Sequence, residues 1–279
     1  SSAVFESTKM PSSSATSSSG QGQASIGLPV SVVSVVVLVV VVVVVVDGSV
    51  VRSPVVVSVV VLGSRVVVPV WPSVWPPVGL LSVVLASFLL WRQRDIKRLF
   101  AYSSIEHMGI ITFAFGMGGP VANFAALLHM TVHSLTKSAI FFAAGHAAQK
   151  SGSQLMDNIR GLITTNPTVG WGLMLGTLAI LGIPPFGVFA SEFLILTTAM
   201  QDQPWATPIL LAALGIAFAA IFGRVQSMVF GETTARRLPH SPALLPVFVH
   251  LALVLMLGLY VPPYLANWYG QAARLIGGP

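Results

Sequence analysis

The sequence predicts an all-α, polytopic membrane protein, and three observations support this fold class. First, 54% of the 279 residues are hydrophobic and only 8% are charged, whereas a soluble domain carries about 25% charged residues. Second, the mean hydropathy is +0.86. Third, apolar stretches long enough to cross a bilayer recur along the chain. A soluble enzyme is thereby excluded. A nucleic-acid-binding protein is excluded too, because the net charge is only +6.

The N-terminal part of the chain differs in composition from the rest. Residues 1–26 are rich in serine and lack apolar periodicity, so we expect them to be disordered. Residues 27–77 form a valine-rich, low-complexity segment, in which 26 of the 41 residues from 30 to 70 are valine. The uncharged run 28–46 has spanning length but lacks the small residues that direct helix packing. Two interpretations are open: a low-complexity anchor or, as we favour, translation out of frame until about Gly79.

Residues 78–262 have the composition of an ordinary helical membrane domain, with small residues among the apolar ones. We predict six spans, at about 76–91, 99–117, 121–147, 168–200, 206–229 and 243–262, followed by a tail over 263–279. The fourth span is too long for one straight crossing and contains Pro184, Pro185 and Gly187. These residues should break the helix and free backbone carbonyls. Broken helices at membrane depth hold ion sites in transporters.

The basic residues predict the orientation of this domain. The loops 92–98, 148–167 and 230–242 alternate along the predicted topology and therefore lie on one side of the membrane. They contain eight basic residues, whereas the opposite side has only Arg274. The positive-inside rule places these three loops in the cytoplasm. Their basic residues are Arg92, Arg94, Lys97, Arg98, Lys150, Arg160, Arg236 and Arg237.

Ionisable side chains inside the predicted spans are the candidate functional residues, because charge in a bilayer is costly and usually functional. Three of them lie four residues apart on the third span and therefore form one stripe along that helix. Histidine titrates near neutral pH, so a stripe of two histidines and a lysine suits a proton relay. The candidates are Glu106 and His107 in the second span, His129, His133 and Lys137 in the third, and Glu192 in the fourth.

Other roles for these residues are open. His129 and His133 have the spacing of metal or haem ligands, but no third ligand of the expected kind lies nearby in the sequence. We therefore expect no metal site. Lys137 could instead form a structural ion pair with Glu106 or Glu192.

Asp95 and Lys97 lie where the second span begins, and two interpretations of them are also open. They either belong to the proton path or pair at the helix entrance, where an aspartate also suits the helix N-terminus.

Three segments together resemble one known family. They are residues 94–109 (RDIKRLFAYSSIEHMG), 128–138 (LHMTVHSLTKS) and 182–193 (GIPPFGVFASEF). Their sequences and their order are similar to those of the antiporter-like membrane subunits of respiratory complex I and of membrane-bound hydrogenases. Two stretches most resemble the hydrogenase-4 branch of that family. They are residues 104–109 (SIEHMG), at the end of the first segment, and residues 145–149 (GHAAQ). The resemblance extends from about Gly79 to the end of the chain.

The resemblance implies a fourteen-helix fold with two inverted five-helix repeats, each with one broken helix, and this chain matches its second half. It implies that His129, His133 and Lys137 form a central hydrophilic axis, with Asp95 and Lys97 beside it. It also implies that Glu192 is the ionisable residue of the second broken helix. The glutamate and lysine of the family's first repeat have no match here.

The function implied by this resemblance is proton translocation in a hydrogenase-4 or NADH:quinone oxidoreductase-like complex of the bacterial inner membrane. Because no motif here binds a redox cofactor, we expect none in this chain. Electron transfer would then belong to partners, namely other membrane subunits and a peripheral redox module. Two alternatives are a subunit of a cation/proton antiporter of the Mrp type and a structural subunit without ion movement.

Overall fold

The computed structural model describes residues 56–61, 64–69, 74–233 and 244–277. The chain divides into two units, residues 1–40 and 41–279, and every described residue belongs to the second. Several predictions fall at least partly outside the described residues. They concern the disordered segment 1–26, the valine-rich segment 27–77 with the span at 28–46, and the loop 230–242 with Arg236 and Arg237.

From residue 75 onward the described chain is helical, which agrees with the predicted fold class. A short 3₁₀ helix, Met156–Asn158, follows the third helix. The α-helices are α1 (Trp75–Trp91), α2 (Ile96–Met117), α3 (Gly119–Ser151), α4 (Leu162–Thr165), α5 (Pro167–Ile180), α6 (Gly187–Asp202), α7 (Ala206–Phe230), α8 (Leu245–Leu259) and α9 (Pro263–Gly277).

The valine-rich segment contains the one departure from an all-α chain within the described residues. Strands β1 (Val56–Val61) and β2 (Ser64–Pro69) pair as an antiparallel hairpin, with Val56 opposite Pro69 and Val61 opposite Ser64. Branching at Cβ restricts the valine side chain and favours extended backbone. We predicted no strand here, because we considered this segment only as an anchor or a misread frame.

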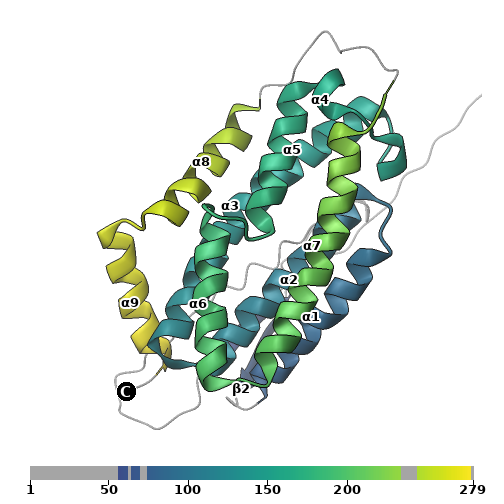
Figure 1. Cartoon of the computed structure of the whole chain (residues 1–279). Coiled ribbons are helices and arrows are strands. Elements are labelled where there is room, and N and C mark those ends of the chain that lie inside the picture. The colour runs from purple at the N-terminus through teal and green to yellow at the C-terminus, as the bar shows by residue number, and fades with distance from the viewer. Residues whose placement is uncertain (1–55, 62–63, 70–73, 234–243, 278–279) are drawn as a thin grey trace, which may run out of the picture. The chain divides into compact units, whose positions relative to one another are not determined.

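Helix α3 is central to the helical part, since it packs against α2, α5, α6, α8 and α9 (Figure 1). It begins after Gly118, at φ 73°, with Pro120 in its first turn, and it ends at Gly152, which adopts φ 63°. Proline at the start and a left-handed glycine at the end are typical helix boundaries. The stripe of ionisable residues on α3 contacts α2 and α6, two of these five neighbours.

Helices occur at the positions of all six predicted spans, and the fourth span is divided as predicted. Helix α5 ends at Ile180 and α6 begins at Gly187, so Pro184 and Pro185 lie in the break and Gly187 starts the second half. The Pro184–Pro185 peptide bond is cis. The segment expected to be a tail instead forms α9, which buries Tyr269 and Ala273.

Length and apolar composition single out few of these helices as membrane spans. Among the described residues, α7 is the one helix that meets both requirements by itself. Helices α8 and α9 meet them as a pair, bent by 74°. Helices α1 and α5 are apolar but shorter. A count of six spans therefore stays a prediction.

The loops predicted to share one side of the membrane come together at one end of the helices. The amide of Ile96 donates to the carbonyl of Gln154 at 3.0 Å, and the amide of Met156 donates to the carbonyl of Arg94 at 2.9 Å. A hollow there is lined by residues from 150–169 and 230–233, including Lys150. The side of the membrane on which this end lies stays a prediction.

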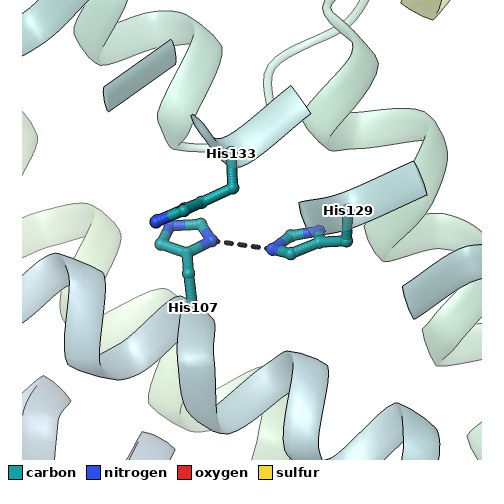
Figure 2. Close-up of side chains that lie close together, drawn as sticks. All are labelled: His107, His129 and His133. Atoms are coloured by element: carbon teal, nitrogen blue, oxygen red, sulfur yellow. Dashed lines mark hydrogen bonds between the residues drawn. The ribbon is translucent and has the colours of Figure 1, made fainter. Parts of the chain in front are cut away.

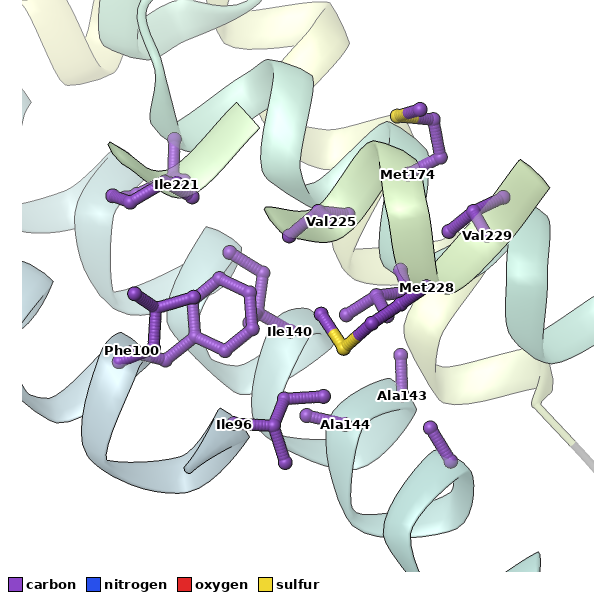
Figure 3. Close-up of a cluster of buried hydrophobic side chains, with 14 of the residues drawn as sticks. Ile96, Phe100, Ile140, Ala143, Ala144, Met174, Ile221, Val225, Met228 and Val229 are labelled. Atoms are coloured by element: carbon purple, nitrogen blue, oxygen red, sulfur yellow. The ribbon is translucent and has the colours of Figure 1, made fainter. Parts of the chain in front are cut away.

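A buried apolar cluster joins α2, α3, α5, α7 and α8 (Figure 3). Phe100 of α2 and Ile140 of α3 are fully buried in it, together with Ile221 and Val225 of α7. This packing fixes the start of α2 against α3 and α7. Since Phe100 also accepts a hydrogen bond from Lys137, the cluster holds one end of the polar stripe in place.

Candidate functional site

Three histidines from two helices converge in the interior of the protein. His107 comes from α2, and His129 and His133 come from successive turns of α3 (Figure 2). Their exposed fractions are 3%, 0% and 5%. The stripe predicted for α3 is thus buried, and His107 faces it from the neighbouring helix.

The imidazoles are in direct contact. His107 Nδ1 lies 3.0 Å from His129 Nε2, within hydrogen-bonding distance. The His107 ring stacks on the His129 ring at a centroid distance of 5.2 Å and lies 4.9 Å from the His133 ring. His133 Nδ1 is buried and has no hydrogen-bond partner within the described residues. One nitrogen of this cluster is therefore unsatisfied.

Helix α6 adds two polar side chains to the histidines. Ser191 Oγ lies 2.9 Å from His129 Nδ1, and Glu192 Oε1 lies 3.8 Å from His107 Nδ1. Ser191 also bonds the carbonyls of Val188 and Gly187 at 2.9 and 3.2 Å. A hydroxyl has a single proton, so donating it to one of these carbonyls leaves its oxygen to accept from His129 Nδ1–H. In a neutral His129, Nε2 then accepts from His107.

A glycine in the helix break makes room for the carboxylate of Glu192. Gly182 adopts φ +63°, and a Cβ at this position would overlap Glu192 Oε2. The backbone of the break therefore forms part of the wall around the carboxyl group. Sequence reasoning did not single out Gly182 or Ser191, although both lie in the segment 182–193 that resembles the known family.

Lys137, the last residue of the stripe on α3, contacts a backbone carbonyl. Its Nζ donates a hydrogen bond of 2.9 Å to the carbonyl of Phe100 and lies 5.7 Å from the centre of that ring. Glu106 is 2% exposed and interacts electrostatically with Lys137. Neither Glu106 nor Glu192 comes within 4.0 Å of the Lys137 ammonium group. The alternative of a close structural ion pair is therefore not what this geometry shows.

Asp95 and Lys97 lie away from the histidines. Lys97 is ten residues from His107 along α2, which corresponds to about 15 Å of helix. The Asp95 side chain accepts from the amides of Lys97 and Arg98 at 2.8 and 3.0 Å and so caps α2. This contact fits the interpretation of Asp95 as a helix N-terminal group. A place of Asp95 and Lys97 in the proton path stays a prediction.

The arrangement as a whole is a line of groups that can hold or pass a proton. The histidines contact one another, Ser191 and Glu192, and Lys137 lies one helical turn beyond His133 on α3. The described part of the chain also contains one group of three or more possible metal ligands, and these are the same three histidines.

Comparisons with known proteins concern the family and the fold of this chain. A family model described as "NADH:quinone oxidoreductase/Mrp antiporter, TM" matches residues 28–219. A hydrogenase-4 component F homolog of Methylacidiphilum infernorum (isolate V4) is 48% identical over 199 residues, which is 71% of this chain and 42% of that protein. The chain thus spans less than half the length of this relative.

Two solved assemblies contain chains of similar fold. One is the membrane-bound sulfane sulfur reductase, an archaeal respiratory membrane complex, with a TM-score of 0.68 and 27% identity. That match covers 74% of this chain and 42% of the other. The other is the Mrp complex from Dietzia sp. DQ12-45-1b, with a TM-score of 0.64 and 18% identity over 73% of this chain and 47% of that one. At this identity the second match shows the fold alone.

Proposed function

The chain belongs to the transmembrane family of NADH:quinone oxidoreductase and Mrp antiporter subunits, and from this premise we propose a specific role for it. It is the proton-translocating, non-redox part of a hydrogenase-4 or NADH:quinone oxidoreductase-like complex. The proton path consists of His129, His133, Lys137 and Glu192 with His107 and Glu106. The complex lies in the bacterial inner membrane.

One observation carries this proposal: the contact of His107 with both His129 and Glu192. It joins the stripe on α3 to the carboxylate on the broken helix, through distances of 3.0 and 3.8 Å. Both contacts are made by the same ring nitrogen, His107 Nδ1, so this atom can hold a proton between the carboxylate and His129. A His107 that carries its own proton on Nε2 can accept a proton from Glu192 at Nδ1 and release that proton to the lone pair of His129 Nε2, which returns His107 to its neutral form. His133 lies in ring contact with His107 beside this route.

Lys137 is the gate of this path in our proposal. Its ammonium group is held by the Phe100 carbonyl and lies one helical turn beyond His133. Neither Glu106 nor Glu192 forms a close ion pair with the Lys137 ammonium group. A small displacement of the Glu106 carboxylate therefore changes the electrostatic potential at Lys137 without breaking an ion pair. Repeated movement of that carboxylate would load and unload the lysine. This is how a change elsewhere in the membrane domain would drive a proton along the stripe.

Energy for this movement comes, in our proposal, from partner subunits. Relatives of this chain are subunits of multi-subunit membrane complexes. We expect other membrane subunits and a peripheral redox module, either a hydrogenase or a quinone reductase, to supply the electron transfer. We expect the chain itself to contribute no cofactor to this reaction.

Alanine substitutions in the complete complex test the proposal. We expect Lys137→Ala and Glu192→Ala to abolish proton pumping in proteoliposomes, while the redox module keeps its electron-transfer rate. Lys150→Ala, on the exposed end of the same helix α3, and Asp202→Ala, at the exposed end of α6, are matched controls and should leave pumping intact. Unchanged proton-to-electron ratios in both test variants would refute the relay.

A cation/proton antiporter subunit is the second candidate, because the matching family includes Mrp antiporters and the Mrp complex shares the fold. Co-purification separates the two. A bound hydrogenase or quinone-reducing module supports the first function. Sodium/proton exchange without a redox partner supports the second. Loss of complex assembly in the Lys137 variant, with pumping normal in the complexes that still form, would instead indicate a structural subunit.

A further inference from the structure

The three histidines combine the chemistry and the convergence of a metal ligand set. One ring nitrogen from each of His107, His129 and His133 lies within 4.8 Å of the other two. Sequence spacing supplied only the pair on α3, and the missing third ligand was the reason to expect no metal. The fold supplies that third ligand from α2. We propose that this cluster binds a divalent transition-metal ion of the zinc type.

The distances between the ligand atoms suit such an ion. Zinc binds imidazole nitrogen at about 2.0–2.1 Å, so nitrogens at tetrahedral angles lie about 3.3–3.4 Å apart. His107 Nδ1 and His129 Nε2 are 3.0 Å apart and need to separate by only a few tenths of an ångström. His133 completes the set by a rotation of its ring. This rotation breaks no hydrogen bond at Nδ1, which has no partner among the described residues.

The surroundings of His129 already fix the tautomer that a metal requires. A ligating histidine donates its other N–H to a neighbouring acceptor, which orients the ring and raises its basicity. Ser191 Oγ lies 2.9 Å from His129 Nδ1 and can accept from it, because the serine proton has two carbonyl acceptors of its own. The lone pair of His129 Nε2 is then directed at His107. The ion takes the place of the proton that these two nitrogens share.

Glu192 is the fourth ligand in this proposal. Its Oε1 is 3.8 Å from His107 Nδ1, and its side chain is only 12% exposed. Three neutral imidazoles and one carboxylate around a divalent ion leave a net charge of +1. A buried charge of this size is tolerated more readily than the +2 of an ion held by histidines alone. Carboxylate oxygen is also an ordinary ligand of zinc.

The bound ion would act as an inhibitor of proton transfer. This consequence rests on the proposed function, whereas metal binding itself does not. The ion occupies lone pairs of His107, His129 and His133, which are the atoms through which the relay passes its proton. Occupancy and transport therefore exclude each other at this cluster.

Cobalt spectroscopy and zinc titration test the site in the full chain, purified in nanodiscs or within its complex. We expect Co²⁺ to give the intense visible absorption of a tetrahedral centre and Zn²⁺ to displace it. His107→Gln and His129→Gln should each weaken Zn²⁺ binding by about tenfold to a hundredfold or more. His146→Gln is the matched control, because His146 lies on the same helix α3 and outside the cluster, and it should bind Zn²⁺ as the unmodified chain does.

The outcomes separate the metal proposal from the relay proposal. Equal Zn²⁺ affinity in the His107, His129 and His146 variants, each checked for folding by circular dichroism, would overturn the metal site and leave the relay untouched. An octahedral Co²⁺ spectrum would overturn it as well. Tetrahedral binding that requires His107 and His129 supports the site. If such binding occurs without any loss of proton transport, the metal site stands and the relay through these histidines fails.

Discussion

Gly182→Ala is the substitution that tests how the helix break positions Glu192. An alanine Cβ at this position would overlap Glu192 Oε2, so the carboxyl group must turn away from the break. Glu192 Oε1 lies 3.8 Å from His107 Nδ1, so a rotation of the carboxyl group away from the break ends this contact. We expect proton transport to fall by a factor on the order of ten to a hundred, as misplacement of a reacting group by about 1 Å does. Assembly of the complex should persist.

The backbone effect of this substitution needs a separate control, and the chain contains one. Gly182 and Gly152 both adopt φ +63°, so alanine at either position costs about 1–2 kcal/mol of backbone strain. Gly152 lies at the end of α3, and a Cβ added there would meet nothing within 4 Å. Gly152→Ala therefore reproduces the strain without the displacement of Glu192.

The assay compares proton pumping and thermal unfolding of the two alanine variants in the same complex. Both should lose similar stability, whereas only Gly182→Ala should lose transport. If both variants lose transport equally, backbone strain explains the effect and the positioning role of Gly182 is wrong. If neither variant loses transport, proton transport does not depend on the orientation of the Glu192 carboxyl group seen here.

Three further predictions concern stability. Asp95→Ala should lower the free energy of unfolding by about 1 kcal/mol through loss of the α2 cap, and Asp95→Asn should not; loss of transport in a stable Asn variant would instead show that the charge is needed. Gly109→Ala should force α1 and α2 apart and lower the melting temperature, because the added Cβ would overlap the backbone of α1. Gly145→Ala has open space around it and should not, so equal melting temperatures of the two variants would contradict the prediction. Tyr269→Phe should destabilise α9 by about 1 kcal/mol without affecting transport, because the hydroxyl bonds Thr131, which lies outside the proposed proton path. Unaltered unfolding would show that this bond contributes nothing.

Helix positions could be predicted from the sequence because apolar runs and their breakers are local signals. The prolines at 184 and 185 stop a helix wherever it packs, and the break lies where they predict it. The C-terminal helix α9 was missed for the opposite reason. It is short and mixed in polarity, and its burial depends on contacts of Tyr269 and Ala273 with the N-terminal half of α3, far away in the sequence.

The candidate site divides in the same way. Spacing of four residues within one helix determines a common face, so the stripe of His129, His133 and Lys137 could be predicted. The partners of that stripe depend on how separate helices are rotated about their axes. His107 was selected as a candidate because it is ionisable inside a span, but its contact with His129 follows only from the packing of α2 on α3.

The break itself explains why the carboxylate partner could not be assigned from spacing. Between Ile180 and Gly187 the chain leaves the helix, so α6 begins with a new rotational phase that the residue count does not determine. The same non-helical segment, which interrupts the helical periodicity, places Gly182 against the carboxyl group of Glu192. A continuous helix would place residues 182 and 192 about 15 Å apart along its axis. The interruption is therefore what allows backbone and carboxylate to meet beside the histidines, and restoring a helix there should separate them.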